Sequence, residues 1–131
     1  MSKSKKQICV IDDDKSVCMA LSALLGTYGF AVDAFTSAKD FFRRISDNAC
    51  GCILLDIHMP QMDGWETLKR IVKSGRRCPV IIITADKNGG LRLNALNAGA
   101  VGYLQKPFND RELVELIEAA FENERKNKPK L

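Results

Sequence analysis

Hydrophobic and polar positions follow two different periods along the chain, one typical of strands and one typical of helices. Five short, mainly apolar runs predict strands over residues 7–12, 30–35, 52–57, 80–85 and 101–106. Residues 53–55 and 80–83 are apolar without alternation, which is typical of central strands buried on both faces of a sheet.

The segments between these runs carry apolar residues at the three- and four-residue spacing of amphipathic helices. Four apolar stripes are clear: Val17, Ala20, Leu21, Leu24 and Leu25; Phe41, Phe42 and Ile45; Trp65, Leu68, Ile71 and Val72; Leu113, Leu116, Ile117, Ala120 and Phe121. Each stripe follows a side chain that can cap a helix: Asp14, Ser37 with Asp40, Asp63, and Asn109 with Glu112. The third helix is expected to stop near Gly75.

The fourth predicted helix is the weakest. Asn88, Gly89 and Gly90 precede it and Gly99 closes it, so only eight or nine residues are available. Each glycine inside a helix costs about 1 kcal/mol relative to alanine. We therefore expect this segment to be the softest part of the fold.

Strands that alternate with helices imply right-handed βαβ units and an α/β domain with a parallel sheet covered on both faces. The 131 residues suffice for one such domain. We place it at residues 7–123, between a basic N-terminal tail at residues 1–6 and a charged C-terminal tail or linker at residues 124–131.

The formal net charge of +4 comes from the ends of the chain. Residues 7–124 hold 13 basic and 16 acidic side chains, so the predicted domain is slightly acidic. We expect no direct nucleic-acid binding by this domain, because such binding calls for a basic patch on the folded body. No apolar run is long enough to span a bilayer or to form a signal peptide, so we expect a cytoplasmic protein without a membrane partner.

The cysteines point to a reducing compartment rather than to a framework of disulfides. There are five, an odd number, namely Cys9, Cys18, Cys50, Cys52 and Cys78. Cys50 and Cys52 lack the spacing of the usual zinc or redox pairs, and His58 is the only histidine. Buried free thiols are the favoured interpretation.

Chemistry-bearing side chains follow four of the five predicted strands. The carboxyl ends of parallel strands share one edge of the sheet, where ligands of open α/β folds bind. This edge receives Asp12, Asp13 and Asp14 from the first strand, Asp56 from the third, Thr84 from the fourth and Lys106 from the fifth.

Carboxylates this close cannot all be ionised without a cation. Asp12, Asp13 and Asp56 form a hard oxygen site suited to Mg²⁺, for which Mn²⁺ can substitute. Lys106 and Thr84 supply the positive charge and the hydrogen bond that a phosphoryl group requires, and Asp56 can attack phosphorus.

Each of these residues also has a purely structural interpretation. Asp14 alone is more typical of a helix cap than of a ligand, and Asp56 could cap the turn that follows it. Thr84 and Lys106 alone could be a strand-end hydroxyl and a solvated ammonium. Their joint occurrence at four strand ends favours a functional site.

Four motifs together resemble the receiver domain of bacterial two-component response regulators, and most closely the FixJ/NarL-like kind. They are V-I-D-D-D at 10–14, L-L-D-I-H-M-P-Q-M-D-G at 54–64, I-I-I-T-A at 81–85 and L-Q-K-P-F at 104–108. The resemblance covers roughly residues 7–122. It implies a flavodoxin-like, doubly wound (βα)5 fold with strand order 2-1-3-4-5.

The resemblance also implies a role for each site residue. Asp56 would be the phosphoacceptor, taking its phosphoryl group from a phosphohistidine of a sensor histidine kinase or phosphotransfer protein. Asp13, Asp56 and the backbone carbonyl of His58 would bind Mg²⁺ directly, and Asp12 through water. Lys106, followed by a cis peptide bond to Pro107, would pair with the phosphoryl oxygens.

Signalling would follow as a shift between two conformations. The resemblance implies that Thr84 moves towards the phosphoryl group and that Tyr103 swings inward with it. The surface of the fourth helix, fifth strand and fifth helix would change, and could form a homodimer. His58 and Asp86 occupy positions that resemble those tuning dephosphorylation in the family. Such a domain catalyses only its own phosphoryl uptake and hydrolysis.

Two rival functions have weaker support. Asp12, Asp14 and Ser16 approximate the D-x-D-x-[TV] motif of haloacid-dehalogenase-like phosphatases, but that interpretation leaves Asp56 unexplained. A flavin or dinucleotide site would need glycines where the first strand is followed by acids. We recognise no output segment after Phe121. We therefore expect either a stand-alone receiver or a domain cut from a longer regulator, and the basic tail slightly favours the second alternative.

Overall fold

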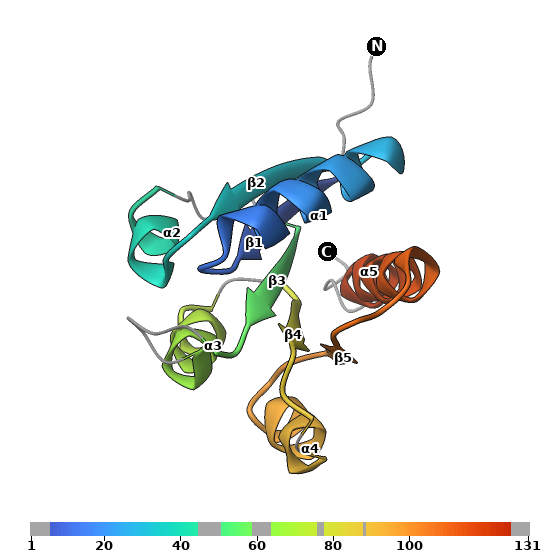
Figure 1. The fold of residues 1–131 in the computed structure, drawn as a ribbon. Helices are drawn as coiled ribbons and strands as arrows, with labels where there is room; N and C mark the ends of the chain where they lie inside the picture. Colours follow the sequence, from blue (N-terminus) through green and yellow to red (C-terminus); the bar gives the residue numbers. More distant parts are fainter. Residues whose placement is uncertain (1–5, 45–50, 59–63, 76–77, 88, 127–131) are drawn as a thin grey trace.

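The computed structural model describes residues 6–44, 51–58, 64–75, 78–87 and 89–126 of the chain. Strands and helices alternate strictly along it (Figure 1). The strands are β1 (Gln7–Ile11), β2 (Ala31–Phe35), β3 (Cys52–Asp56), β4 (Val80–Thr84) and β5 (Gly102–Gln105). The helices are α1 (Lys15–Thr27), α2 (Ala38–Arg44), α3 (Gly64–Lys73), α4 (Gly90–Asn97) and α5 (Asp110–Lys126).

The five strands form one parallel sheet in the order β2-β1-β3-β4-β5, so the strand order implied by the resemblance is confirmed. Every residue of β3 and β4 is buried, as their uninterrupted apolar runs predict. The register pairs Asp56 on β3 with Ile83 on β4, which places the ends of these two strands side by side.

Helices cover both faces of the sheet and create two separate cores (Figure 1). Side chains of α2, α3 and α4 pack on one face, around residues such as Phe41 and Leu68. Side chains of α1 and α5 pack on the other, around residues such as Leu25 and Ile117. This arrangement leaves the two ends of the strands open, and the carboxyl end carries the candidate site.

The helix starts follow the predicted capping chemistry where the structure describes them. The side chain of Asp14 accepts the N–H groups of Ser16 and Val17 at 2.8 and 3.4 Å, and that of Ser37 accepts the N–H of Asp40 at 3.0 Å. At α5, Asn109 and Glu112 exchange two side-chain-to-backbone hydrogen bonds, a complete capping box. The predicted cap Asp63 lies outside the described residues, as do Ile45 and Cys50.

The structure differs from the sequence predictions at several element ends and faces. Ala20 and Val72 are exposed although they belong to the predicted apolar stripes, whereas Cys18, which does not, is buried. Helix α5 continues to Lys126, three residues past the expected domain end, because its last residues are good helix formers. Cys9, Cys18 and Cys52 are buried free thiols, as expected, and Cys78 is a half-buried one.

Helix α4 is short and poorly anchored, in agreement with its glycine-rich start. It has eight residues, its N-cap Gly89 makes no side-chain capping bond, and only Ala95 of this helix is buried. Leu93 and Leu96 point their side chains into solvent. None of the described helices is long and apolar enough to cross a lipid bilayer.

Gly64, at the first position of α3, is expected to tolerate no larger residue. A Cβ there would overlap the backbone of Ile57 and lie 2.5 Å from its Cα. Gly64→Ala should therefore lower the free energy of unfolding by about 1–3 kcal/mol, as overpacking does. Urea denaturation measures this change.

Gly26 in α1 provides the matched control for that substitution. A Cβ at this helical glycine would meet no atom within 4 Å. Gly26→Ala should raise the free energy of unfolding by about 0.5–1 kcal/mol through helix propensity. Equal effects of the two substitutions would contradict the close approach of α3 to Ile57.

Candidate functional site

Five of the predicted site residues meet at the carboxyl edge of the sheet. Asp12 and Asp13 follow β1, Asp56 ends β3, Thr84 ends β4 and Lys106 follows β5. Carboxylate oxygens of Asp12, Asp13 and Asp56 all lie within 4.8 Å of one another. The ammonium of Lys106 reaches two of these three acids, so the structure forms the cluster that the strand ends predict.

Asp12 is the buried anchor of the cluster. Its side chain is completely inaccessible to solvent, and both of its oxygens have partners. Oδ1 accepts the backbone N–H of Asp14 at 2.9 Å, and Oδ2 lies 3.1 Å from Nζ of Lys106. A buried carboxylate requires such partners to remain charged, and Lys106 provides the opposite charge.

Asp56 sits at the centre of the site and is chemically unusual. Its Oδ1 accepts the backbone N–H of His58 at 3.1 Å, and its Oδ2 lies 4.0 Å from Nζ of Lys106. Burial raises the pKa of Asp56 from the ordinary 3.8 to about 6, and the neighbouring charges of Asp12 and Asp13 act in the same direction. The hydrogen bond from His58 and the charge of Lys106 oppose this rise.

Asp13 and Asp14 have different roles although they are adjacent in sequence. Asp13 is exposed and its carboxylate belongs to the cluster. Asp14 caps α1 instead, since its Oδ1 accepts N–H groups of that helix. The phosphatase-like motif requires Asp12 and Asp14 to share one site, and this placement of Asp14 does not support it.

Thr84 and Lys106 are joined through the backbone at the ends of β4 and β5. The N–H of Lys106 donates to the carbonyl of Thr84 at 2.6 Å, and the Lys106–Pro107 peptide bond is cis, as the resemblance implies. The side chain of Thr84 is fully buried, and its hydroxyl accepts the N–H of Asp86 at 3.1 Å. Thr84 is therefore held by the loop that follows its own strand.

His58 and Asp86 contact each other across the mouth of the site. Nε2 of His58 lies 2.8 Å from Oδ2 of Asp86, which bridges the loops after β3 and β4. Both residues are predicted site residues, but their contact is not evident from the sequence. The signal was available: each lies two residues beyond the end of its strand, and β3 and β4 are neighbours in the sheet.

Tyr103 on β5 belongs to the same corner of the molecule. Its side chain is half-buried and packs against the core on the α3 and α4 side of the sheet. Burial raises the pKa of the Tyr103 hydroxyl, and the charge of Asp86 adds to the rise. Tyr103 therefore lies within electrostatic reach of Asp86.

The donor set fits a hard divalent cation. Three carboxylates within 4.8 Å, faced by a single ammonium, carry more negative charge than Lys106 can neutralise. Mg²⁺ prefers oxygen ligands such as carboxylates and keeps several of its waters. It therefore suits a carboxylate site at the open edge of a sheet. With its pKa raised only to about 6, Asp56 is mainly ionised at pH 7 and can act as a ligand.

Fold and site together define a doubly wound α/β domain with a cluster of three carboxylates, faced by a lysine, at the carboxyl edge of its sheet. The chain belongs to the response regulator receiver domain family, whose model matches residues 8–118. This bears out the resemblance seen in the four sequence motifs.

Similar proteins include regulators from several bacteria. The response regulator protein TodT of Pseudomonas putida is 35% identical over all of this chain. The transcriptional regulatory protein FixJ of Bradyrhizobium diazoefficiens is 38% identical over 89% of it. The chain spans only 59% and 57% of these two relatives.

The fold is also found among solved structures. The CheY-like receiver domain protein of Methanospirillum hungatei superimposes with a TM-score of 0.87, over 95% of this chain and 100% of that one, at 29% identity. The fold of this chain is therefore that of a solved receiver domain.

Proposed function

We propose that this receiver domain accepts a phosphoryl group on Asp56 from a phosphohistidine of a sensor histidine kinase or phosphotransfer protein. The observation that carries the proposal is the joint position of Asp56 and Lys106, with Nζ 4.0 Å from Oδ2 in a cluster of three carboxylates. Phosphoryl uptake adds negative charge next to the three carboxylates. Lys106 and a cation that enters with the phosphoryl group can neutralise this charge, so the site suits the step.

In this step an oxygen of Asp56 forms a bond to phosphorus while the bond between phosphorus and the donor nitrogen breaks. The imidazole leaves with the bonding electron pair. The N–H of His58 orients the Asp56 carboxylate through Oδ1, and Lys106 stabilises the charge on the phosphoryl oxygens. Its present partner Asp12 keeps Lys106 in reach of that position.

Mg²⁺, with Mn²⁺ as a substitute, would be held by Asp12, Asp13, Asp56 and the backbone carbonyl of His58. When bound, it supplies charge neutralisation for the carboxylates and the phosphoryl oxygens. The chain's own residues position the acceptor and exclude solvent from the buried side of the site.

Phosphorylation would be communicated through Thr84 and Tyr103. The hydroxyl of Thr84 would exchange the N–H of Asp86 for a phosphoryl oxygen, and Tyr103 would move inward beside it. His58 and Asp86, which bridge the site mouth, would tune the rate of hydrolysis. The weakly anchored α4, with β5 and α5, would be the surface that responds and the surface for a homodimer.

We further infer that the domain is not an enzyme acting on other substrates, and that it catalyses only its own phosphoryl uptake and hydrolysis. Its place would be the cytoplasm, without membrane contact and without direct nucleic-acid binding. Residues 7–123 would form the body of the receiver, with α5 continuing three residues beyond it to Lys126, and residues 1–6 and 127–131 would be tails.

Acetyl phosphate tests the proposal without a cognate kinase. With Mg²⁺ present, intact-mass spectrometry should show one added phosphoryl group, and a chelator should remove the effect. Asp56→Asn should abolish the addition, whereas Asp12→Asn should slow but retain it. Retention in Asp56→Asn with loss in Asp12→Asn would instead support the phosphatase mechanism.

A further inference from the structure

Charged residues are segregated on the surface although the domain as a whole is nearly neutral. Helices α2 and α3 carry six basic and two acidic side chains, a net of +4: Lys39, Arg43, Arg44, Lys69, Arg70 and Lys73 against Asp40 and Glu66. All six basic side chains are exposed. We call this surface the α2–α3 basic face.

Two guanidinium groups of the α2–α3 basic face are held in place by aromatic rings. Arg70 on α3 lies over the ring of Phe42 on α2 at 4.0 Å, which ties the two helices together. Arg44 lies over Phe35 at 5.2 Å and pairs with Asp40 at 3.1 Å. Side chains fixed in this way lose less conformational entropy when they bind a carboxylate.

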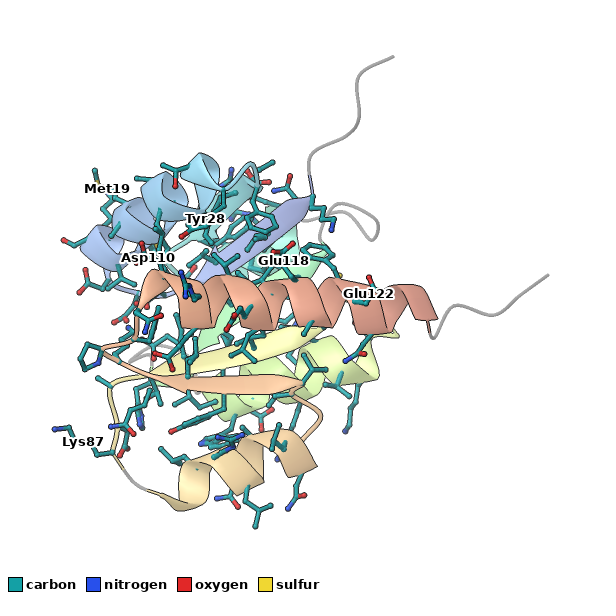
Figure 2. The ribbon with its side chains drawn as sticks, turned by 90° about the vertical axis from the view of Figure 1, so that its right-hand side faces the viewer. Met19, Tyr28, Lys87, Asp110, Glu118 and Glu122 are labelled. Atoms are coloured by element: carbon teal, nitrogen blue, oxygen red, sulfur yellow. The ribbon has the colours of Figure 1, made fainter. Side chains whose placement is uncertain are left out.

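Helix α5 carries the opposite charge along its exposed side. Residues 110–123 hold five acidic side chains and one basic side chain, a net of −4: Asp110, Glu112, Glu115, Glu118 and Glu122 against Arg111. Figure 2 shows Asp110, Glu118 and Glu122 spaced along this helix. The acidic residues are exposed, whereas Leu113 and Ile117 of the same helix face the core. We call this surface the α5 acidic ridge.

The two charged surfaces lie on opposite faces of the sheet. Helices α2 and α3 pack against one core and α5 against the other, so no single molecule can bring its two surfaces together (Figure 1). Their net charges are opposite in sign and similar in magnitude. A second copy of this chain therefore offers each surface a complementary partner.

We propose that copies of this chain associate head to tail, with the α2–α3 basic face of one copy on the α5 acidic ridge of the next. Such a contact is heterologous, so it extends to short chains of molecules rather than closing as a two-fold dimer. The two surfaces consist mainly of exposed charged side chains, so the association is weak and strongly dependent on salt. It does not require phosphorylation.

Sedimentation velocity of the full chain over a range of concentrations tests the proposal. At an ionic strength of about 0.01 M, where the Debye length is about 30 Å, the mean sedimentation coefficient should rise with concentration. At about 1 M it should be that of a monomer at every concentration. A monomer under both conditions, or association that salt does not weaken, overturns the proposal.

Charge-reversal variants locate the contact. Arg43→Glu with Lys73→Glu, and separately Glu115→Lys with Glu118→Lys, should each weaken self-association at least tenfold. Mixing the two double variants should restore association as a one-to-one complex, because the first variant keeps its α5 acidic ridge and the second keeps its α2–α3 basic face, while the other surface of each carries no net charge. Lys15→Glu with Arg92→Glu changes the net charge by the same amount as the first variant and should leave association unchanged.

The same basic face could instead serve a nucleic acid, and a DNA duplex distinguishes this outcome. Fluorescence anisotropy with a random-sequence duplex should show no binding that depends on Arg43 and Lys73. If the duplex binds through these residues while the chain remains monomeric at low salt, the head-to-tail contact is excluded. Failure of any of these tests leaves phosphoryl uptake at Asp56 unaffected, because none of the exchanged residues contacts that site.

Discussion

Replacing Asp56 with asparagine is expected to stabilise the protein at neutral pH while abolishing phosphoryl uptake. Burial and two neighbouring acids raise the pKa of Asp56 to about 6, so its ionised form is disfavoured in the folded chain. A shift of about two units corresponds to about 2–3 kcal/mol. Asp56→Asn removes that charge, and urea denaturation at pH 7.5 without divalent cations should show a gain of this size.

The gain should depend on pH in a defined direction. The folded chain binds the Asp56 proton more tightly than the unfolded chain, so the parent loses stability as pH rises from about 4 to about 6. The advantage of Asp56→Asn should therefore shrink to about 0.5 kcal/mol at pH 4. Saturating Mg²⁺ should stabilise only the parent, since its bound cation favours the ionised cluster.

Glu118→Gln provides the control for the loss of one exposed carboxylate. Its effect on stability should stay within about 0.5 kcal/mol at both pH values. If Asp56→Asn proved no more stable than the parent at pH 7.5, the carboxylates of Asp12, Asp13 and Asp56 would not repel one another in the folded chain.

Lys106→Ala is expected to lower the stability of the protein, in contrast to Asp56→Asn, which should raise it. It removes the ammonium 3.1 Å from the fully buried Asp12 and 4.0 Å from Asp56. Breaking a buried ion pair costs about 3–5 kcal/mol, and the partial exposure of Lys106 places this loss near the lower end. Phosphoryl uptake from acetyl phosphate should fall about 100-fold, as it does when a stabilising donor is lost from an active site.

Lys106→Arg separates charge from geometry. It should retain most of the stability, because the positive charge near Asp12 remains, but should slow phosphoryl uptake, because a guanidinium is larger and planar. Denaturation and intact-mass time courses on the same samples measure both effects. Uptake that is unchanged in Lys106→Ala would remove Lys106 from the proposed step.

The sequence was sufficient for much of the fold because local and global patterns agree. Unbroken apolar runs at residues 53–55 and 80–83 can only be buried on both faces, which forces β3 and β4 into the centre of the sheet. The polar residues after those runs then had to meet at one edge, as Asp56 and Thr84 do. The order of the strands came from the family resemblance, since the alternating pattern is compatible with several orders.

Other features depend on pairs of elements that the sequence does not connect. The bridge from His58 to Asp86 follows from the neighbouring positions of β3 and β4, which only the sheet order reveals. Val72 follows the helical period, but its side chain remains 45% exposed. The opposite charges of the two sheet faces were hidden because they cancel in the sum over the domain.

The most direct measurement is the identification of the residue that carries the phosphoryl group. The chain is incubated with acetyl phosphate and Mg²⁺, the acyl phosphate is reduced with borohydride, and the peptides are sequenced by tandem mass spectrometry. We predict a single homoserine, at position 56. Modification at Asp12 or Asp14 instead, or no modification while Mg²⁺ is bound, would contradict the central claim.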